Sequence, residues 1–201
     1  MILNLFLPGT PVKGRCQQGA RPHRGSDRAL YSGAVELIEG LLTRRSVRQF
    51  APRPVSREQV LEILRAGSWA PSGLNNQPWR FVIVFDAAVR GRLAGLTRYG
   101  RILEEAPVCL PVFFDREVGY HEVKDHQSIG ACVQNLLLAA HGLGLGAVWL
   151  GEILKSAREV REVLGLPASL ELMAVVALGH PKGAVKAPAR RELSELIVKE
   201  L

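Results

Sequence analysis

The apolar positions of this chain follow two different periods, and the change between them separates expected helices from expected strands. Segments that repeat apolar residues every three or four positions indicate amphipathic helices. The expected helices of this kind cover residues 35–43, 56–67 and 125–141. Shorter segments that are almost continuously apolar indicate buried strands. The expected strands cover residues 80–85, 107–114, 147–150 and 172–178. Strands separated by helices favour an α+β fold, with a mixed sheet flanked by helices.

Polar residues mark the expected ends of several helices. Ser56 and Gln59 have the spacing of a capping box, which predicts that a helix starts at this point. Asp86 is placed to cap a further helix, and Ser156 is expected to cap a helix that stops at Gly165.

Glycines at positions 142, 144 and 146 follow the longest expected helix. They form a G-x-G-x-G pattern, but a helix precedes it and a strand follows it. A dinucleotide-binding turn needs the opposite order, with the strand before the glycines and the helix after them. We therefore interpret these glycines as the end of the helix.

Residues 1–33 differ from the remainder of the chain, because they show no hydrophobic period and are rich in Gly, Pro and Arg. They contain five basic residues against one acidic residue, a net charge of +4 out of +7 for the whole sequence. We expect a flexible basic extension over residues 1–33 and one domain over residues 34–201. This concentration of charge argues against a nucleic-acid partner for the domain. Salt-sensitive binding of nucleic acid through the extension is the alternative.

Composition excludes several other classes of protein. No apolar run reaches the ~20 residues that cross a bilayer, and Pro8 interrupts the apolar start, so neither a membrane span nor a signal peptide is expected. Cys109 and Cys132 lie in apolar contexts without a C-x-x-C pair, which favours a reducing, cytoplasmic setting. Neither H-E-x-x-H nor G-x-S-x-G occurs, and the histidines are scattered, so no metal site is expected.

The run T-R-R-S-V-R-Q-F at residues 43–50 places three guanidinium groups and a hydroxyl close together. Arginine suits forked recognition of phosphate and carbonyl oxygens. Taken alone, the run also fits a solvated cationic helix end.

A second run, A-P-S-G-L-N-N-Q-P-W at residues 70–79, changes that balance. The two runs together resemble the signature of the nitroreductase-like flavin oxidoreductases, in which R-R-S-x-R-x-F is followed, one helix later, by A-P-S-x-x-N-x-Q-P-W. The resemblance covers roughly residues 34–201. It implies a nitroreductase-like fold and an intertwined homodimer, with FMN at the interface between the subunits.

The resemblance also assigns roles in FMN binding to residues of the first run. Arg44 would contact the phosphate or ribityl region, and Arg48 would reach the N1–C2 side of the isoalloxazine ring, where positive charge stabilises the reduced form. Ser46 belongs to the same motif, and Arg45 is an additional candidate for the phosphate. Arg190, with Lys186 or Arg191, matches the C-terminal basic site for the phosphate.

The rest of the implied flavin site comes from two other segments. Pro71, Ser72 and Asn75 match the motif that the partner subunit contributes in this family, and Gln77 either supports that turn or contacts the cofactor. The backbone at Leu150 and Gly151 matches the segment beside the central ring. Gly151 stands where some relatives have Glu, so a backbone amide would have to supply the hydrogen bond near N5.

The function implied by the resemblance is hydride transfer from NADH or NADPH, through bound FMN, to a nitroaromatic, quinone or similar small acceptor in a ping-pong mechanism. No side chain needs to act as an acid or a nucleophile, because the cofactor supplies the chemistry. The acceptor would lie between residues 98–101 and 118–124, where Tyr99 and Tyr120 could flank an aromatic ring. Alternatives are a flavin-binding sensor, or dehalogenation, heterocycle oxidation or FMN fragmentation on the same fold.

Overall fold

A computed structural model describes residues 36–185 and 187–201, so the expected extension over residues 1–33 and Lys186 lie outside the described residues. The helices are α1 (Leu37–Thr43), α2 (Arg57–Ser68), α3 (Ala87–Ala94), α4 (Gly100–Glu105), α5 (Glu122–Gly142), α6 (Ala157–Leu164) and α7 (Leu193–Leu196), with 3-10 turns η2 (Gly73–Asn75) and η3 (Glu152–Ser156). The strands are β1 (Trp79–Phe81), β2 (Val108–Asp115), β3 (Gly146–Leu150) and β4 (Leu170–Gly179).

The four strands form one sheet in the order β1-β2-β4-β3, and every pair of neighbouring strands is antiparallel. Among the described residues, the parallel part of the expected mixed sheet is limited to an isolated bridge between Ser46 and Ala147, which lays the first basic run along the edge of β3. All eight residues of β2 are buried, as expected for a strand covered on both faces.

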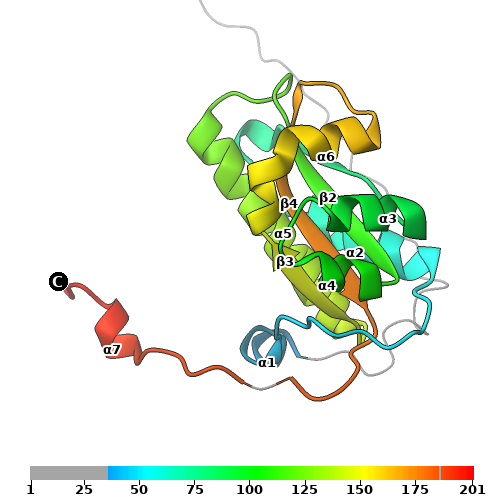
Figure 1. Cartoon of the computed structure of the whole chain (residues 1–201). Helices are drawn as coiled ribbons and strands as arrows, with labels where there is room; N and C mark the ends of the chain where they lie inside the picture. The colour runs from blue at the N-terminus through cyan, green and yellow to red at the C-terminus, as the bar shows by residue number, and fades with distance from the viewer. Residues whose placement is uncertain (1–35, 186) are drawn as a thin grey trace, which may run out of the picture.

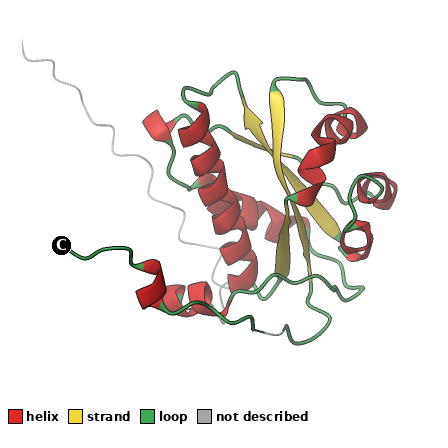
Figure 2. Ribbon diagram, turned by 60° about the vertical axis from the view of Figure 1, so that its left-hand side comes forward, coloured by secondary structure: helices red, strands yellow, loops and turns green. Residues whose placement is uncertain are grey.

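Helices cover both faces of this sheet, which gives the α+β fold three layers (Figure 2). The helices α2 and α5 pack on one face, and α3, α4 and α6 pack on the other. Alternate residues of β2 enter the two cores: Leu110 and Val112 face α2 and α5, whereas Cys109 and Phe113 face the opposite helices.

The helix α5 is the longest element, and its 21 residues span about 30 Å at 1.5 Å per residue. Its apolar stripe, predicted from the sequence, is buried against α2 and the sheet. Gly67 at the end of α2 permits the close approach, because a Cβ atom there would lie 2.3 Å from Leu136 Cδ2.

Most of the helix ends that were predicted from local sequence signals are present in the structure. The capping box of Ser56 and Gln59 is present at the start of α2, and Asp86 caps α3 through the Val89 N–H. Gly165 ends α6 with φ +65°. Ser156 is the N-cap residue of α6, as expected, but its side chain makes no capping hydrogen bond, and the residue also belongs to the turn η3 that precedes α6.

The C-terminal segment leaves the domain after β4, passes α1 and ends beyond α7, away from the sheet (Figure 1). Its apolar side chains are strongly exposed; Val198, for example, is fully accessible. The outer face of α1 is also apolar and exposed, with Leu37 at 69% and Leu42 at 70%. Within the described residues, no helix combines the length and the hydropathy that a transmembrane span requires.

Candidate functional site

The first basic run lies between α1 and α2, and its backbone is fixed to the sheet. The Val47 N–H donates to Ala147 O at 3.0 Å, and the Ala51 N–H donates to His180 O at 2.8 Å. The side chains of Val47 and Phe50 are buried in the core beneath the run. These apolar anchors hold the run in place while its polar side chains remain at the surface.

Four guanidinium groups gather around a cavity of about 380 Å³ at this surface, and Ser46 lines the same cavity. They belong to Arg44, Arg45, Arg48 and Arg190, so the fold brings the C-terminal arginine to the first run. None of these four groups has a carboxylate within ion-pair distance in the part of the chain that the structure describes. An anion such as a phosphate would balance this charge.

The like charges of this cluster lower pKa values within it. Partial burial lowers the pKa of Arg44, and the charges of Arg190 and Arg45 lower it further. The neighbouring His141, at the end of α5, has its pKa lowered by burial and then by Arg44 and Arg45. Its Nε2 lies 2.9 Å from the hydroxyl of Thr43. A bound anion would favour the charged forms of these groups.

A smaller cavity of about 190 Å³ adjoins this cluster at the end of β3, and Arg48 lines both. The backbone at Leu150 and Gly151 forms one wall, and Tyr99 stands at another. The geometry therefore brings seven of the expected cofactor residues together in one copy of the chain: Arg44, Arg45, Ser46, Arg48, Leu150, Gly151 and Arg190.

The loop that carries Tyr99 is tied to the residue immediately after Gly151. The carboxylate of Glu152 accepts hydrogen bonds from Thr97 Oγ1 at 2.6 Å and from the Arg98 N–H at 3.1 Å. It also pairs with Lys155. Hydrogen bonds from Lys155 and Thr97 lower the pKa of Glu152 to about 2, so this carboxylate remains ionised.

The second run forms a tight loop around η2. Its residues Leu74, Asn75 and Gln77 have positive φ, which is uncommon for residues other than glycine. The hydroxyl of Ser72 accepts the Gln77 N–H at 3.1 Å, and the Gln77 side chain donates to Asn75 O at 3.3 Å. These bonds within the loop hold its unusual backbone shape.

The two runs lie at opposite ends of α5. The first run meets His141 at the C-terminal end, whereas Asn76 of the second run donates to Asp125 at the N-terminal end. His141 follows Asp125 by 16 residues, or about 24 Å along the helix. Within one copy, the structure does not bring the four expected residues of this run to the basic cluster: Pro71, Ser72, Asn75 and Gln77. Lys186 lies outside the described residues.

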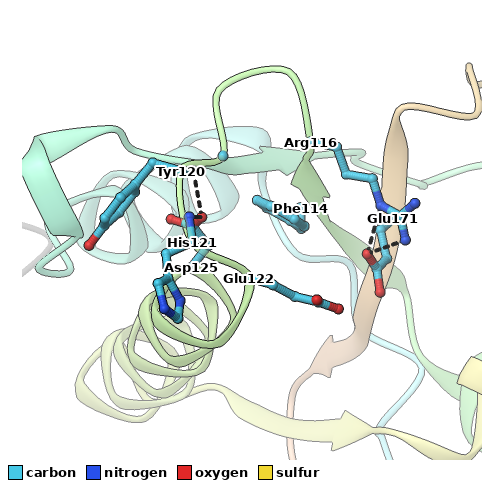
Figure 3. Close-up of a pocket in the computed structure, with 8 residues that line it drawn as sticks. Phe114, Arg116, Tyr120, His121, Glu122, Asp125 and Glu171 are labelled. Carbon is cyan, nitrogen blue, oxygen red and sulfur yellow. Dashed lines mark hydrogen bonds and ion pairs between the residues drawn. The ribbon is translucent and has the colours of Figure 1, made fainter.

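A polar cavity of about 340 Å³ lies next to the second run, at the N-terminal end of α5 (Figure 3). Tyr120, His121 and Asp125 line one side of it, and an ion pair between Arg116 and Glu171 at 2.8 Å closes the other. Sequence reasoning did not identify Asn76 or Asp125 as site residues. Only the fold reveals them, because they are 49 positions apart in the chain.

Other side-chain chemistry is scarce in the described residues. Among them, no group of three or more His, Cys, Asp or Glu side chains is arranged to hold a metal ion. Burial raises the pKa of both Cys109 and Cys132 to about 12, so neither thiol is a nucleophile at neutral pH.

Comparison with known proteins gives consistent results. The model of the nitroreductase family matches residues 41–102 and 95–180. A protein of Archaeoglobus fulgidus described as an NADH dehydrogenase/NAD(P)H nitroreductase is 35% identical over 150 residues, which are 73% of this chain and 86% of that protein. An iodotyrosine deiodinase of Thermotoga neapolitana is 31% identical over 163 residues, which are 69% of this chain and 84% of that protein.

Solved structures share the fold. A protein from Desulfovibrio desulfuricans, described as a nitroreductase in complex with FMN, superposes with a TM-score of 0.78 and 48% sequence identity. The match covers 82% of this chain and 96% of that protein.

Proposed function

Because this chain belongs to the nitroreductase family, we propose that it is an FMN-dependent oxidoreductase that transfers hydride from NADH or NADPH to a nitroaromatic, quinone or similar small acceptor. The observation that carries this proposal is the cluster of four guanidinium groups without carboxylate partners among the described residues, which adjoins the cavity at the end of β3. A basic pocket beside a narrow slot fits a phosphate attached to a planar ring. The FMN complex of the Desulfovibrio desulfuricans protein supports the same cofactor.

In this proposal each residue of the first half-site has a defined role. Arg44, Arg45 and Arg190 bind the phosphate, and Ser46 adds a hydroxyl donor. Arg48 lines both cavities, so its charge can reach the N1–C2 side of the ring. The backbone N–H groups at Leu150 and Gly151 lie beside the ring. A Cβ atom at Gly151 would have no neighbour within 4 Å, so this position leaves room beside the backbone.

A homodimer is proposed because one copy separates the two half-sites. The second run contacts α5 at Asp125 and the first run contacts it at His141, about 24 Å farther along the helix, so one copy does not bring the two runs to one cavity. A second copy can bring its own second run to the cluster. The exposed apolar face of α1 and the exposed apolar C-terminal segment provide surface that such a partner would cover.

The chemistry of the reaction belongs to the cofactor: bound FMN accepts a hydride from the nicotinamide and returns it to the acceptor. The protein orients the two substrates and stabilises charge. Arg48 supplies positive charge at the ring, while Glu152, through Thr97, holds Tyr99 at the edge of the slot. With the flavin ring in this cavity, donor and acceptor would react in turn at the one open face of the ring. This supports a ping-pong mechanism.

The direct test is spectroscopic. Purified protein should show flavin absorbance that bleaches under anaerobic NADH or NADPH and returns when a nitroaromatic or a quinone is added. Parallel lines in double-reciprocal plots would support the ping-pong order, and intersecting lines would contradict it. Protein that takes up no FMN even when FMN is supplied would refute the cofactor assignment.

The dimer has its own test. Deletion of residues 192–201 removes the exposed apolar end of the C-terminal segment and keeps Arg190. If this segment clasps a second copy, the truncated protein should elute as a monomer and bind FMN more weakly. Full-length protein that elutes as a monomer and still binds FMN would contradict the shared site.

A second candidate function is reductive dehalogenation, which the similarity to the Thermotoga neapolitana deiodinase favours. Turnover of a halogenated phenol, with halide release measured beside nitroaromatic reduction, separates the two reactions. A third possibility is a flavin-binding sensor, which would retain FMN without being reduced by either nicotinamide. The unpaired buried thiols and the use of NAD(P)H support a cytoplasmic setting.

A further inference from the structure

Asp125, in the first turn of α5, is fully buried, and its two oxygens join three segments of the chain. Its Oδ2 accepts the backbone N–H groups of Tyr120 at 2.9 Å and His121 at 2.8 Å, as Figure 3 shows. Its Oδ1 accepts the side-chain amide of Asn76 at 2.7 Å. Burial alone would raise the pKa of Asp125, but the three hydrogen bonds outweigh burial and lower it, so the group is an anion.

Asn76 connects this carboxylate to the second run. Its Nδ2 donates both to Asp125 and to the carbonyl oxygen of Val118 at 3.1 Å. Both partners can only accept, which fixes the orientation of the amide. Its own oxygen is buried without a partner among the described residues, so turning the amide over would give up both bonds.

The neighbours of Asn76 show what this connection controls. Asn75 and Gln77, on either side, have positive φ, and such conformations persist only where the surrounding structure holds them. Gly73 in the same loop lies against Tyr120, because a Cβ atom there would be 1.7 Å from the Tyr120 hydroxyl. The second run and the loop over residues 116–121 therefore form one fixed unit.

We propose that Asp125 is a positioning residue that, through Asn76, sets the shape of the FMN-binding loop presented to the other copy and, through the backbone of Tyr120, the loop beside it. The inference rests on the proposed function, since it assigns this loop to the flavin of the partner. It makes FMN affinity and acceptor recognition depend on one buried carboxylate that touches neither molecule.

The test uses two variants of the full-length protein. Asp125→Asn keeps the size of the side chain, and its oxygen can still accept the N–H groups of Tyr120 and His121. Its amide nitrogen would then face the Asn76 donor, so the link to the loop is lost while the helix cap remains. The FMN Kd, measured by fluorescence quenching, should rise by about tenfold or more. This is the loss expected when one hydrogen bond to a charged group, here the bond between Asn76 and Asp125, is removed. Asn76→Ala leaves both backbone bonds to Asp125 in place and should weaken binding similarly.

Two further variants separate positioning from general stability. The exchange Asn76→Asp with Asp125→Asn restores a hydrogen bond between the two side chains with donor and acceptor reversed, and should recover part of the FMN affinity lost in Asp125→Asn. Ser128→Ala is the matched control, because among the described residues its buried hydroxyl donates to Lys124 O, within the same end of α5. This control should bind FMN like the original protein.

The outcomes discriminate clearly. If Asp125→Asn lowers the Tm of the apoprotein but leaves FMN Kd and the KM of the acceptor unchanged, Asp125 only caps a helix and the inference is wrong. If Asp125→Asn fails to fold, the same measurements of Tm, FMN Kd and acceptor KM on Asn76→Ala decide whether the inference holds. Unaltered protein that binds no FMN would overturn both the proposed function and this inference. Unaltered protein that binds FMN, beside an Asn76→Ala variant that binds it equally well, would overturn the inference alone.

Discussion

Substitution of Arg190 by Ala should weaken FMN binding without destabilising the free protein. Arg190 lines the basic cavity with Arg44 and Arg45, and its charge lowers the pKa of Arg44. In the free protein these like charges repel each other. In the FMN complex the phosphate would pair with these charges. The electrostatic contribution of Arg190 would therefore change from unfavourable to favourable when the ligand binds.

The expected magnitudes follow from these two roles. A hydrogen bond between charged groups contributes roughly 1.5–3 kcal/mol, and each 1.4 kcal/mol changes Kd tenfold, so Arg190→Ala should raise the FMN Kd by about 10- to 100-fold. Repulsion between solvated surface charges is about 1 kcal/mol or less. The free energy of unfolding of the apoprotein should therefore stay the same or rise by no more than about that amount.

The assay is a fluorescence titration of FMN at low and high salt, with urea unfolding of each apoprotein. Arg158→Ala is a suitable control because it removes the same charge from the surface of α6, where Arg158 pairs with Glu162 at 3.4 Å. Salt should weaken FMN binding to the original protein more than to Arg190→Ala, since the variant has one charge fewer at the phosphate.

Two results would refute this reasoning. If Arg190→Ala and Arg158→Ala weaken binding equally, only net charge matters and the cluster is not a specific phosphate site. If Arg190→Ala lowers apoprotein stability and leaves the FMN Kd unchanged, Arg190 has a structural role in the C-terminal segment.

Three further predictions concern the fold around the site. The folded-state pKa of Glu152 is lowered from 4.5 to about 2, so its carboxylate stabilises the fold above pH 4.5 and loses that contribution as the pH falls toward 2. The free energy of unfolding in urea should therefore differ between Glu152→Gln and the original protein at pH 7, and the two values should converge at low pH. A difference that stays constant with pH would contradict this. Leu136→Ala, which empties a fully buried position between α2 and α5, should cost about 2–5 kcal/mol of unfolding free energy, measured by denaturant titration. Cys16 is the third cysteine of the sequence, so the thiol test uses a Cys16→Ser background. The buried thiols of Cys109 and Cys132 should then react with a thiol reagent at pH 8 only after unfolding, and fast labelling of native protein would show that they are accessible.

Much of the fold could be predicted because its signals are local. The capping box of α2, the apolar stripe of α5 and the buried run of β2 each lie within one element and depend on few distant contacts. The helix α4 was not predicted, since its six residues lack a capping side chain and depend on the burial of Ile102 and Leu103 against the sheet. The start of α6 after Ser156 was predicted correctly, but the capping hydrogen bond was not formed, because Ser156 also belongs to the preceding turn η3.

The candidate site likewise has one part that could be predicted from the sequence and one part that could not. The basic run was recognisable because its three arginines lie within five consecutive positions, and because the apolar anchors Val47 and Phe50 lie in the same short segment. Asp125 gave no such signal, since an acidic residue in the first turn of a helix is ordinary. Its role depends on Asn76, 49 positions earlier, and on a loop whose positive φ values no residue type announces.

The length of α5 explains why the two sequence runs lie apart in a single copy of this chain. Asp125, which contacts the second run, and His141, which contacts the first run, are about 24 Å apart along the helix, and neither of the two cavities at the basic cluster is lined by described residues of the second run. In the proposed dimer, a twofold axis would place the second run of each copy against the basic cluster of the other, because in such an interface every contact occurs twice. Two equivalent flavin sites result, each with one half from either chain. In this proposal, the rigidity that Asp125 gives to the second run would act on the partner's cofactor, while the arginine cluster would act on the cofactor of its own copy.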